Sequence, residues 1–411
     1  MYTKVLCIFS KSLTIQYTND KEINKFFILT RRLVRICCKH NNLFSRYRYD
    51  IIIVGSGLYG AILVYRAKQN GLRCLVLERR KKVGGNVRDE WIDGINVHQY
   101  GAHIFHTEDE QIWNFISQFS DFIPYFHTVM ARYKEKLYHL PFSMYTFYDI
   151  YGITKPYELE QILVEEHQKE WYEHPDSLEE MAINIVGRTI YEILIKGYTE
   201  KQWGVSAREL SADLINRLPI RSTFDNRYFN DRYQGIPSNG YSKIIKKLLK
   251  GIEVKTNTDF CLTRNYWIQQ SKKIVYTGMI DELFGYSDGT LGYRSLDFAS
   301  SELDTPNFQG LAVINETDYN VPFTRIIEHK HFMPLSNIPQ IIITKEYPKV
   351  WKPGEEAYYP IDTRENNAKY KKYIEKAKEQ YPTIFFGGRL GCYKYYDMDD
   401  AIRAALNYKF L

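Results

Sequence analysis

The chain has 411 residues, of which 44% are apolar and 25% charged, so it can hold one large core or two to three packed globular domains. Its net charge of +6 arises in residues 1–48, which contain ten basic and two acidic residues, so we expect no nucleic-acid partner for the body. Six cysteines without CxxC spacing argue against a metal site or a disulfide framework and favour the cytoplasm. No apolar run reaches the ~18 residues of a membrane span.

Residues 1–48 form a basic, Asn/Lys-rich extension ahead of what reads as a complete domain start at Tyr49. We expect this extension to be poorly ordered or an over-extended translation start, without a function. A short amphipathic helix over residues 26–38 that touches acidic lipid or a partner is the alternative. A signal peptide fits poorly, because Lys4 and Lys11 interrupt the apolar stretch.

The most informative stretch is a dinucleotide-binding pattern at residues 51–78. Four apolar residues run into Gly55-x-Gly57-x-x-Gly60, a helix is predicted over 61–69, and a second apolar run ends at Glu78. A buried parallel strand, a Gly turn and a helix N-terminus together form a site for a pyrophosphate. In this pattern the glycines allow the turn, the approach of phosphate and close helix packing, and the acid accepts ribose hydroxyls.

A second Gly turn at 84–86 follows the acidic residue, which is more typical of FAD proteins than of simple NAD dehydrogenases. The cofactor-binding residues expected in this part of the chain are Gly55, Ser56, Gly57, Gly60, Glu78, Arg79, Gly85 and Asn86.

Later elements alternate between helical and strand-like patterns. Apolar residues at three-to-four spacing predict a helix after Glu108, residues 126–142 predict a hairpin, and 144–217 predict helices broken at Pro156 and Pro175. Further strands are predicted at 252–256, 273–277, 310–314, 340–344 and 384–386, and a helix at 399–406.

This interleaving predicts an α/β fold with a discontinuous Rossmann-type FAD-binding domain, a helical insertion and an antiparallel β-sheet domain. The expected boundaries are 49–106, 234–290 and 380–411 for the FAD-binding domain. The helical substrate and lid domain takes 107–125 and 143–233, and the antiparallel sheet takes 126–142 and 291–379.

Ten motifs spread over residues 50–411 resemble those of the bacterial-type UDP-galactopyranose mutase family. They are GSGLYGA (55–61), GGN (84–86), GAHIFHT (101–107), KGYTEKQWG (196–204), RLPIR (217–221), YFNDRYQGIPSNGY (228–241), LGYRSLDF (291–298), VPFTRIIEHK (321–330), YYPI (358–361) and GRLGCYKYYDMD (388–399).

The resemblance implies an isomerase that interconverts UDP-galactopyranose and UDP-galactofuranose by ring contraction. Reduced FAD is the implied cofactor, with its N5 atom as the covalent nucleophile on the anomeric carbon. UDP-galactose as substrate, an electron donor such as NADPH and a homodimer are the implied partners.

The same motifs imply the site residues. Arg325 and Arg217 correspond to the diphosphate-binding arginines, Arg217 on or beside a mobile lid around 204–217, and His103 and Asp397 complete the implied catalytic set. The substrate-binding residues implied are Trp203, Tyr198, Tyr228, Phe229, Asn315, Tyr359 and Tyr395. The flavin contacts implied are His103, His106, Arg389, Asp397 and Met398, and no metal is expected.

The chain departs from the family pattern at Ala102, His127 and Phe323 and at the pair Leu194-Ile195. The pair matters most, because the family usually has aromatic residues there that help to form the uridine pocket. Two other readings therefore stay open. One is an FAD-dependent oxidoreductase of the amine-oxidase or desaturase type, which shares the opening motif. The other is a non-catalytic flavin- or nucleotide-binding protein.

Overall fold

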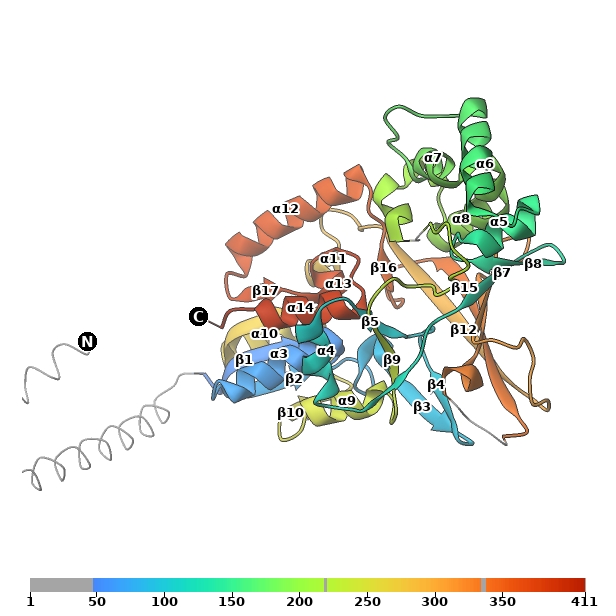
Figure 1. Ribbon diagram of the computed structural model, residues 1–411. Helices are drawn as coiled ribbons and strands as arrows, with labels where there is room; N and C mark the ends of the chain where they lie inside the picture. Colours follow the sequence, from blue (N-terminus) through green and yellow to red (C-terminus); the bar gives the residue numbers. More distant parts are fainter. Residues whose placement is uncertain (1–46, 218–219, 334–337, 411) are drawn as a thin grey trace, which may run out of the picture. The chain divides into compact units, whose positions relative to one another are not determined.

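The computed structural model of the protein describes residues 47–217, 220–333 and 338–410, with only the backbone of Asp213, Asn216 and Arg217. The expectation for the N-terminal extension therefore falls, apart from Tyr47 and Arg48, outside the described residues. The body that begins at Tyr49 is one compact unit, drawn in colour in Figure 1.

A five-stranded parallel sheet holds the dinucleotide pattern. Its order is β10-β2-β1-β11-β17, and its strands are β1 (Tyr49–Val54), β2 (Cys74–Leu77), β10 (Glu253–Lys255), β11 (Ser271–Tyr276) and β17 (Ile384–Phe386). Ile51, Ile52 and Ile53 are at most 1% exposed, because helices cover both faces of the sheet, as expected of a parallel sheet.

The covering helices come from distant parts of the sequence. They are α3 (Leu58–Gln69), α9 (Tyr241–Leu248), α10 (Phe260–Gln270) and α14 (Met398–Asn407). Helices α9 and α14 pack on α3, while α10 contacts the opposite face through Phe260 and Trp267. In Figure 1 the blue start of the body and its red end therefore lie together, and the predicted discontinuous Rossmann-type arrangement is confirmed.

A seven-stranded sheet is the second large sheet of the body, in the order β16-β12-β15-β14-β13-β7-β8. Its strands are β7 (Val129–Tyr133), β8 (Lys136–Leu140), β12 (Tyr293–Leu303), β13 (Val313–Glu316), β14 (Arg325–Glu328), β15 (Ile341–Val350) and β16 (Tyr359–Pro360). The predicted hairpin is present as β7–β8, and Lys134 takes a positive φ of 55° at its turn.

The sheet is antiparallel except between β13 and β7, which run parallel. The expected strand at 310–314 begins later, at Val313, because the chain turns at Gly310 with a φ of 80°. The strand expected at 340–344 extends to Val350, since β15 pairs along its whole length with β12.

The helical part consists of α5 (Met144–Tyr151), α6 (Pro156–Lys169), α7 (Leu178–Ile190), the π-helix η3 (Tyr191–Lys196), α8 (Gly197–Trp203) and the 3₁₀ turns η4 (Ala207–Glu209) and η5 (Ala212–Arg217). Pro156 begins α6 and so marks a helix start, because proline lacks only an N–H that is unpaired at this position anyway. Gly187 bends α7 with a φ of 81°.

The long helix α12 (Arg364–Gln380) and several short elements complete the body: α4 (Glu110–Ser117), α11 (Ile280–Leu283), α13 (Gly388–Gly391), η2 (Gly85–Val87) and η6 (His329–Phe332). Two small sheets, β3 (Asp89–Ile92) with β4 (Ile95–His98), and β5 (Phe105–Thr107) with β9 (Tyr233–Pro237) and β6 (Phe122–Pro124), were not predicted from the sequence.

None of the helices in residues 47–217, 220–333 and 338–410 combines the length and apolar character needed to cross a membrane.

Candidate active site

Two adjoining cavities extend from the end of the parallel sheet to the helical part. The larger, about 710 Å³, is lined by residues of the seven-stranded sheet and of α3, α7, η3 and α8. The smaller, about 170 Å³, lies over the carboxyl ends of β1, β2 and β11. Both cavities are lined by Gly57, Asn86, Thr277 and Leu390, so together they form an elongated site that suits a dinucleotide at the sheet.

The glycines at this end have distinct tasks. A Cβ on Gly60 would lie 2.1 Å from the Gly55 carbonyl oxygen, so α3 can approach β1 only with glycine there. At Gly57 a Cβ would meet only the Gly85 Cα, at 3.8 Å, which leaves open space beside the N-terminus of α3. This geometry matches the roles predicted from the sequence: tight packing at Gly60 and room for a phosphate at Gly57.

Glu78 is buried and holds the Gly turn as well as lining the smaller cavity. Its Oε2 accepts hydrogen bonds from the Ser56 amide at 3.0 Å and the Ser56 hydroxyl at 2.5 Å, and its Oε1 accepts from the Arg80 amide at 2.8 Å. Arg79 lines the same cavity and pairs with Glu282 at 3.4 Å and Glu356 at 3.1 Å.

Arg325 supplies a cation in the larger cavity. It begins β14 opposite Glu346 of β15, and its Nε lies 3.5 Å from the Glu346 Oε1. Its guanidinium also donates a hydrogen bond to the Tyr198 hydroxyl. Burial opposes its charge, but the Glu346 carboxylate and Tyr198 hold the pKa of Arg325 above its usual value. The guanidinium is therefore charged at any physiological pH.

A second cation, Arg389, lies against two tyrosine rings. Its guanidinium carbon is 4.7 Å from the centre of the Tyr395 ring and 5.4 Å from that of Tyr359, and the two rings stack with centroids 5.7 Å apart. The ring centre of Trp203, at the end of α8, lies 6.2 Å from that of Tyr359. Two guanidinium groups among phenol rings form a cavity wall suited to a phosphate-bearing ligand.

Three histidines line the same cavity. The His103 Nδ1–H donates a hydrogen bond to the Gly101 carbonyl oxygen at 2.8 Å, and burial lowers the pKa of His103 to about 4. The His106 ring stacks on the Phe229 ring with their centres 3.6 Å apart, and its Nδ1 is hydrogen-bonded to the Asp231 Oδ2 at 2.7 Å. His127 is 5% exposed, and burial lowers its pKa to about 3, so His103 and His127 are neutral at pH 7.

The remaining expected residues also line the larger cavity. Asn315 is 6% exposed, and its amide oxygen has no hydrogen-bond partner among the described residues. Asp397 and Met398 stand at the N-terminus of α14, and Tyr228 lies beside Phe229. Every expected site residue except Arg217 lines one of the two cavities, and the Arg217 side chain lies outside the described part of the structure.

The sequence did not single out Glu346 or Lys201. Glu346 is 2% exposed, lines the cavity and faces Arg325, and a carboxylate inside a strand-like run after residue 340 was its only signal. The described residues contain no group of three His, Cys, Asp or Glu side chains that could hold a metal ion.

Comparisons with known proteins show the family to which the chain belongs. The profile of the family described as UDP-galactopyranose mutase matches residues 193–395, and an NAD(P)-binding Rossmann-like profile matches residues 53–119. A protein of Klebsiella pneumoniae named "Probable UDP-galactopyranose mutase" is 34% identical over 362 residues, which cover 87% of this chain and 93% of the relative. The dTDP-fucopyranose mutase of Escherichia coli is 34% identical over 364 residues, covering 87% and 96%.

Among solved structures, that of a reduced UDP-galactopyranose mutase aligns with a TM-score of 0.65 at 13% identity, and covers 87% of this chain and 94% of that one. This structural likeness concerns the fold alone, whereas the sequence relatives establish the family. The chain belongs to the UDP-galactopyranose mutase family.

Proposed function

We propose that this protein is an isomerase that interconverts UDP-galactopyranose and UDP-galactofuranose, with reduced FAD as its cofactor. The observation that carries the proposal is Arg325, a guanidinium in the larger cavity beside Tyr198 and Glu346, in a site that adjoins the dinucleotide turn. Family membership supports the same conclusion, because the relatives matched over most of their length are named as nucleotide-sugar mutases.

The residues of the elongated site fit FAD. Gly57 leaves room for the pyrophosphate at the N-terminus of α3, and Gly85 brings the second turn against it, since a Cβ there would lie 2.8 Å from the Gly57 Cα. The smaller cavity, with Glu78 and Arg79, would hold the adenosine half, and His103, His106, Arg389 and Met398 would contact the flavin. When bound and reduced, the flavin supplies the nucleophile for the anomeric carbon of the sugar.

The protein's own groups would manage the charge of the departing nucleoside diphosphate. Displacement of UDP places negative charge on the diphosphate, and fixed cations stabilise such charge best in a site with little water. Arg325 would bind the diphosphate directly, together with Arg217 of the 3₁₀ turn η5. Tyr359 and Tyr395 would donate hydrogen bonds to the diphosphate oxygens. Asp397 would orient the groups at the start of α14.

The other substrate contacts follow from the walls of the cavity. Tyr198, Trp203, Tyr228 and Phe229 give aromatic surfaces for the nucleoside, and the Asn315 amide oxygen would accept a hydrogen bond from a sugar hydroxyl. Leu194 and Ile195 contribute aliphatic surface where the family often has aromatic rings.

A second candidate reaction is the ring contraction of dTDP-fucopyranose. The Escherichia coli relative named dTDP-fucopyranose mutase is 34% identical to this chain, as is the Klebsiella pneumoniae relative named as a probable UDP-galactopyranose mutase. Leu194 and Ile195 support this candidate, because their apolar side chains line the cavity and would suit the extra methyl group of thymine.

The test is turnover by the purified holoenzyme. Incubation with UDP-galactofuranose and dithionite, followed by chromatography, should yield UDP-galactopyranose, with little product when the reductant is omitted. Bound, reduced FAD without turnover of either UDP-galactofuranose or dTDP-fucofuranose would refute the mutase and favour an oxidoreductase or a non-catalytic binding protein. Faster turnover of the dTDP sugar would favour the second candidate.

Arg325→Ala should lower kcat/KM at least about 100-fold, because it removes a guanidinium that would stabilise the departing diphosphate. FAD content, measured by absorbance, should stay at the wild-type level, since Arg325 lies in the substrate part of the site. Arg73→Ala, which breaks an ion pair with Asp50 near the amino end of β1, is the matched control and should keep full turnover. An active Arg325→Ala enzyme would contradict the diphosphate role.

An NADPH-like electron donor, a homodimer and a cytoplasmic location are part of the same proposal, as is the three-part domain division. The distribution of strands supports the division, because the parallel sheet and the seven-stranded sheet draw on the expected segments.

A further inference from the structure

Lys201 on α8 is a buried lysine whose charge is met by main-chain oxygens. It is 9% exposed, and its Nζ lies 2.7 Å from the carbonyl oxygen of Glu316, 2.8 Å from that of Asp318, 3.0 Å from that of Val321 and 3.1 Å from that of Phe323. Four carbonyl oxygens around one ammonium resemble the coordination of a bound monovalent cation. A buried cation held so closely fixes the backbone around it.

The Glu316 carbonyl ends β13, and the other three carbonyls belong to the segment that joins this strand to the next strand of the candidate site. Residues 317–324 connect β13, which carries Asn315, to β14, which begins at Arg325. The negative ends of these carbonyl dipoles point toward one place, so they repel each other unless a positive charge lies between them. The conformation of the 317–324 segment, and hence the start of β14, therefore depends on the Lys201 charge.

The same helix carries two of the cavity's aromatic residues, Tyr198 and Trp203. Its first residue, Gly197, packs so closely on the segment that a Cβ would lie 2.2 Å from the Thr317 carbonyl oxygen. At its other end, the buried Arg294 of β12 donates hydrogen bonds to the carbonyl oxygens of Lys201 at 3.0 Å and Gln202 at 2.8 Å. Helix α8 is therefore fixed to the sheet on two sides.

We infer that Lys201 is a positioning residue of the substrate site: its ammonium holds the 317–324 segment and α8 together, so that Arg325 and Tyr198 meet in the geometry that binds the nucleoside diphosphate. The inference rests on the proposed function for its ligand. Lys201 is not among the described residues that line the two cavities, so it acts through Arg325 and Tyr198.

The charge of this ammonium is sensitive to pH in a useful range. Burial lowers the pKa of Lys201 to about 8, while the carboxylates of Glu316 and Asp318 act in the opposite direction. Glu316 is itself paired with Arg132 at 2.8 Å, and Asp318 accepts from the Asn320 amide at 2.9 Å. Lys201 is therefore charged at pH 7, and above pH 8 it loses the proton that the four carbonyls require.

UDP binding to the reduced holoenzyme between pH 7 and pH 9 tests the inference. Wild-type affinity should fall about tenfold over this range, in proportion to the charged fraction of Lys201. Lys201→Arg, whose guanidinium does not titrate, should show no such fall, and Lys201→Met should bind weakly at both values. Lys196→Met is the control, because Lys196 is half-exposed and pairs with Glu192 on the same helical stretch; it should follow the wild-type profile.

A second measurement does not depend on the ligand. Hydrogen–deuterium exchange at pH 7 should be at least about tenfold faster in residues 317–324 of Lys201→Met than in the wild type or in Lys196→Met. Unchanged exchange, wild-type UDP affinity in Lys201→Met, or identical pH profiles for wild type and Lys201→Arg would each overturn the inference. Absence of UDP binding by the wild type would instead count against the proposed function, and the exchange result would still decide the role of Lys201.

Discussion

At the scale of single residues, the glycines of the dinucleotide turn show that one residue type can serve two purposes. Gly60 allows α3 to pack on β1, because any side chain would collide with the Gly55 carbonyl oxygen. Gly57 has no such neighbour, and its φ of −65° suits any residue. The absence of a side chain at Gly57 therefore makes room for the ligand, whereas the absence of a side chain at Gly60 allows the fold.

Alanine at each position should separate these purposes. Gly57→Ala should purify with at least about tenfold less FAD but with a nearly unchanged free energy of unfolding of the apoprotein, because its Cβ takes only the space of the phosphate. Gly60→Ala should lower that free energy by about 3 kcal/mol or more, since backbone must move to relieve the contact. Flavin absorbance per chain and urea unfolding of the apoproteins measure both; full FAD content in Gly57→Ala would refute the phosphate role.

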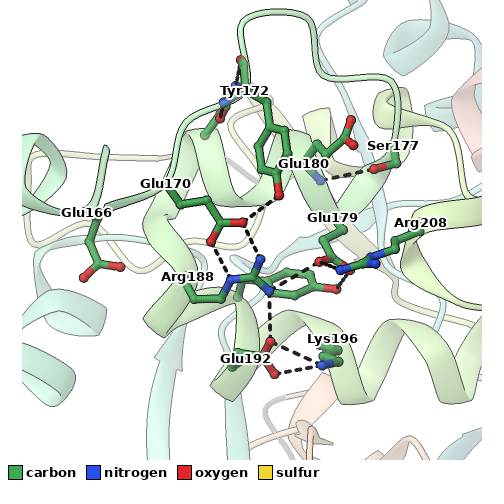
Figure 2. Close-up of polar contacts among 12 residues, drawn as sticks. Glu166, Glu170, Tyr172, Ser177, Glu179, Glu180, Arg188, Glu192, Lys196 and Arg208 are labelled. Atoms are coloured by element: carbon green, nitrogen blue, oxygen red, sulfur yellow. Dashed lines mark hydrogen bonds and ion pairs between the residues drawn. The ribbon is translucent and has the colours of Figure 1, made fainter. Parts of the chain in front are cut away.

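At the scale of elements, a network of charges holds the end of α7 and the turn η4 in place (Figure 2). Arg188 pairs with Glu170 at 2.5 Å and Glu192 at 3.1 Å, while Glu179 accepts from Arg188, Arg208 and the Tyr191 hydroxyl. Because η3 and α8 follow directly on α7, this network sets the direction from which α8 reaches the cavity.

Within this network the buried partner should matter far more than the exposed one. Glu179→Ala should lower the free energy of unfolding by about 3 kcal/mol, because Glu179 is 4% exposed and its loss leaves the buried Tyr191 hydroxyl without its acceptor. Arg208→Ala, at a side chain 72% exposed, should cost far less, because solvent weakens an exposed ion pair. Equal losses in urea unfolding would contradict this order.

At the scale of the whole molecule, buried histidines make the fold sensitive to acid. His98, His127 and His329 are 2%, 5% and 1% exposed, and burial lowers the pKa of all three, to about 3 for His127 and His329. Below the unfolded pKa of about 6.5, the unfolded chain binds protons that the folded chain does not. The stability that these neutral histidines contribute is therefore fully present above pH 6.5. It is lost progressively as the pH falls from 6.5 toward 3.

Between pH 7 and pH 5, His127 and His329 should each contribute about 2 kcal/mol to the loss in the free energy of unfolding, because the unfolded imidazole gains a proton over this range and the folded one does not. His127→Asn, an uncharged polar replacement, should therefore reduce the difference between the two pH values by about 2 kcal/mol. Urea unfolding at pH 7 and pH 5 measures the difference for both proteins. An unchanged difference would show that His127 accepts its proton in the folded state.

The parts of the fold that the sequence predicted are those with strong local patterns. The run of isoleucines before Gly55, the helix after Gly57 and the hairpin around Lys134 each depend on neighbours within a few residues. The parallel pairing of β13 with β7 was missed because it joins segments about 180 residues apart. The small sheet β5-β9-β6 was missed for the same reason, since Phe105 pairs with Gly235.

For the candidate site, the motifs predicted residues by their resemblance to a family, and the structure brings the described ones to two adjoining cavities. Glu346 and Lys201 could not be found in this way, because a carboxylate in a strand and a lysine in a helix are ordinary surface residues in sequence. The pairing of β14 with β15 places Glu346 beside Arg325, and the packing of α8 against the 317–324 segment buries Lys201.

The sequence by itself determined the dinucleotide turn, the discontinuous α/β plan and the family, because these depend on local backbone preferences and on motif order. Tertiary structure decided which charges face one another: Arg325 against Glu346 and Tyr198, and Lys201 against four carbonyl oxygens. The physical reason is distance and burial. A charge acts strongly only on groups within a few ångströms in a site with little water, and those neighbours come from strands and helices far apart along the chain.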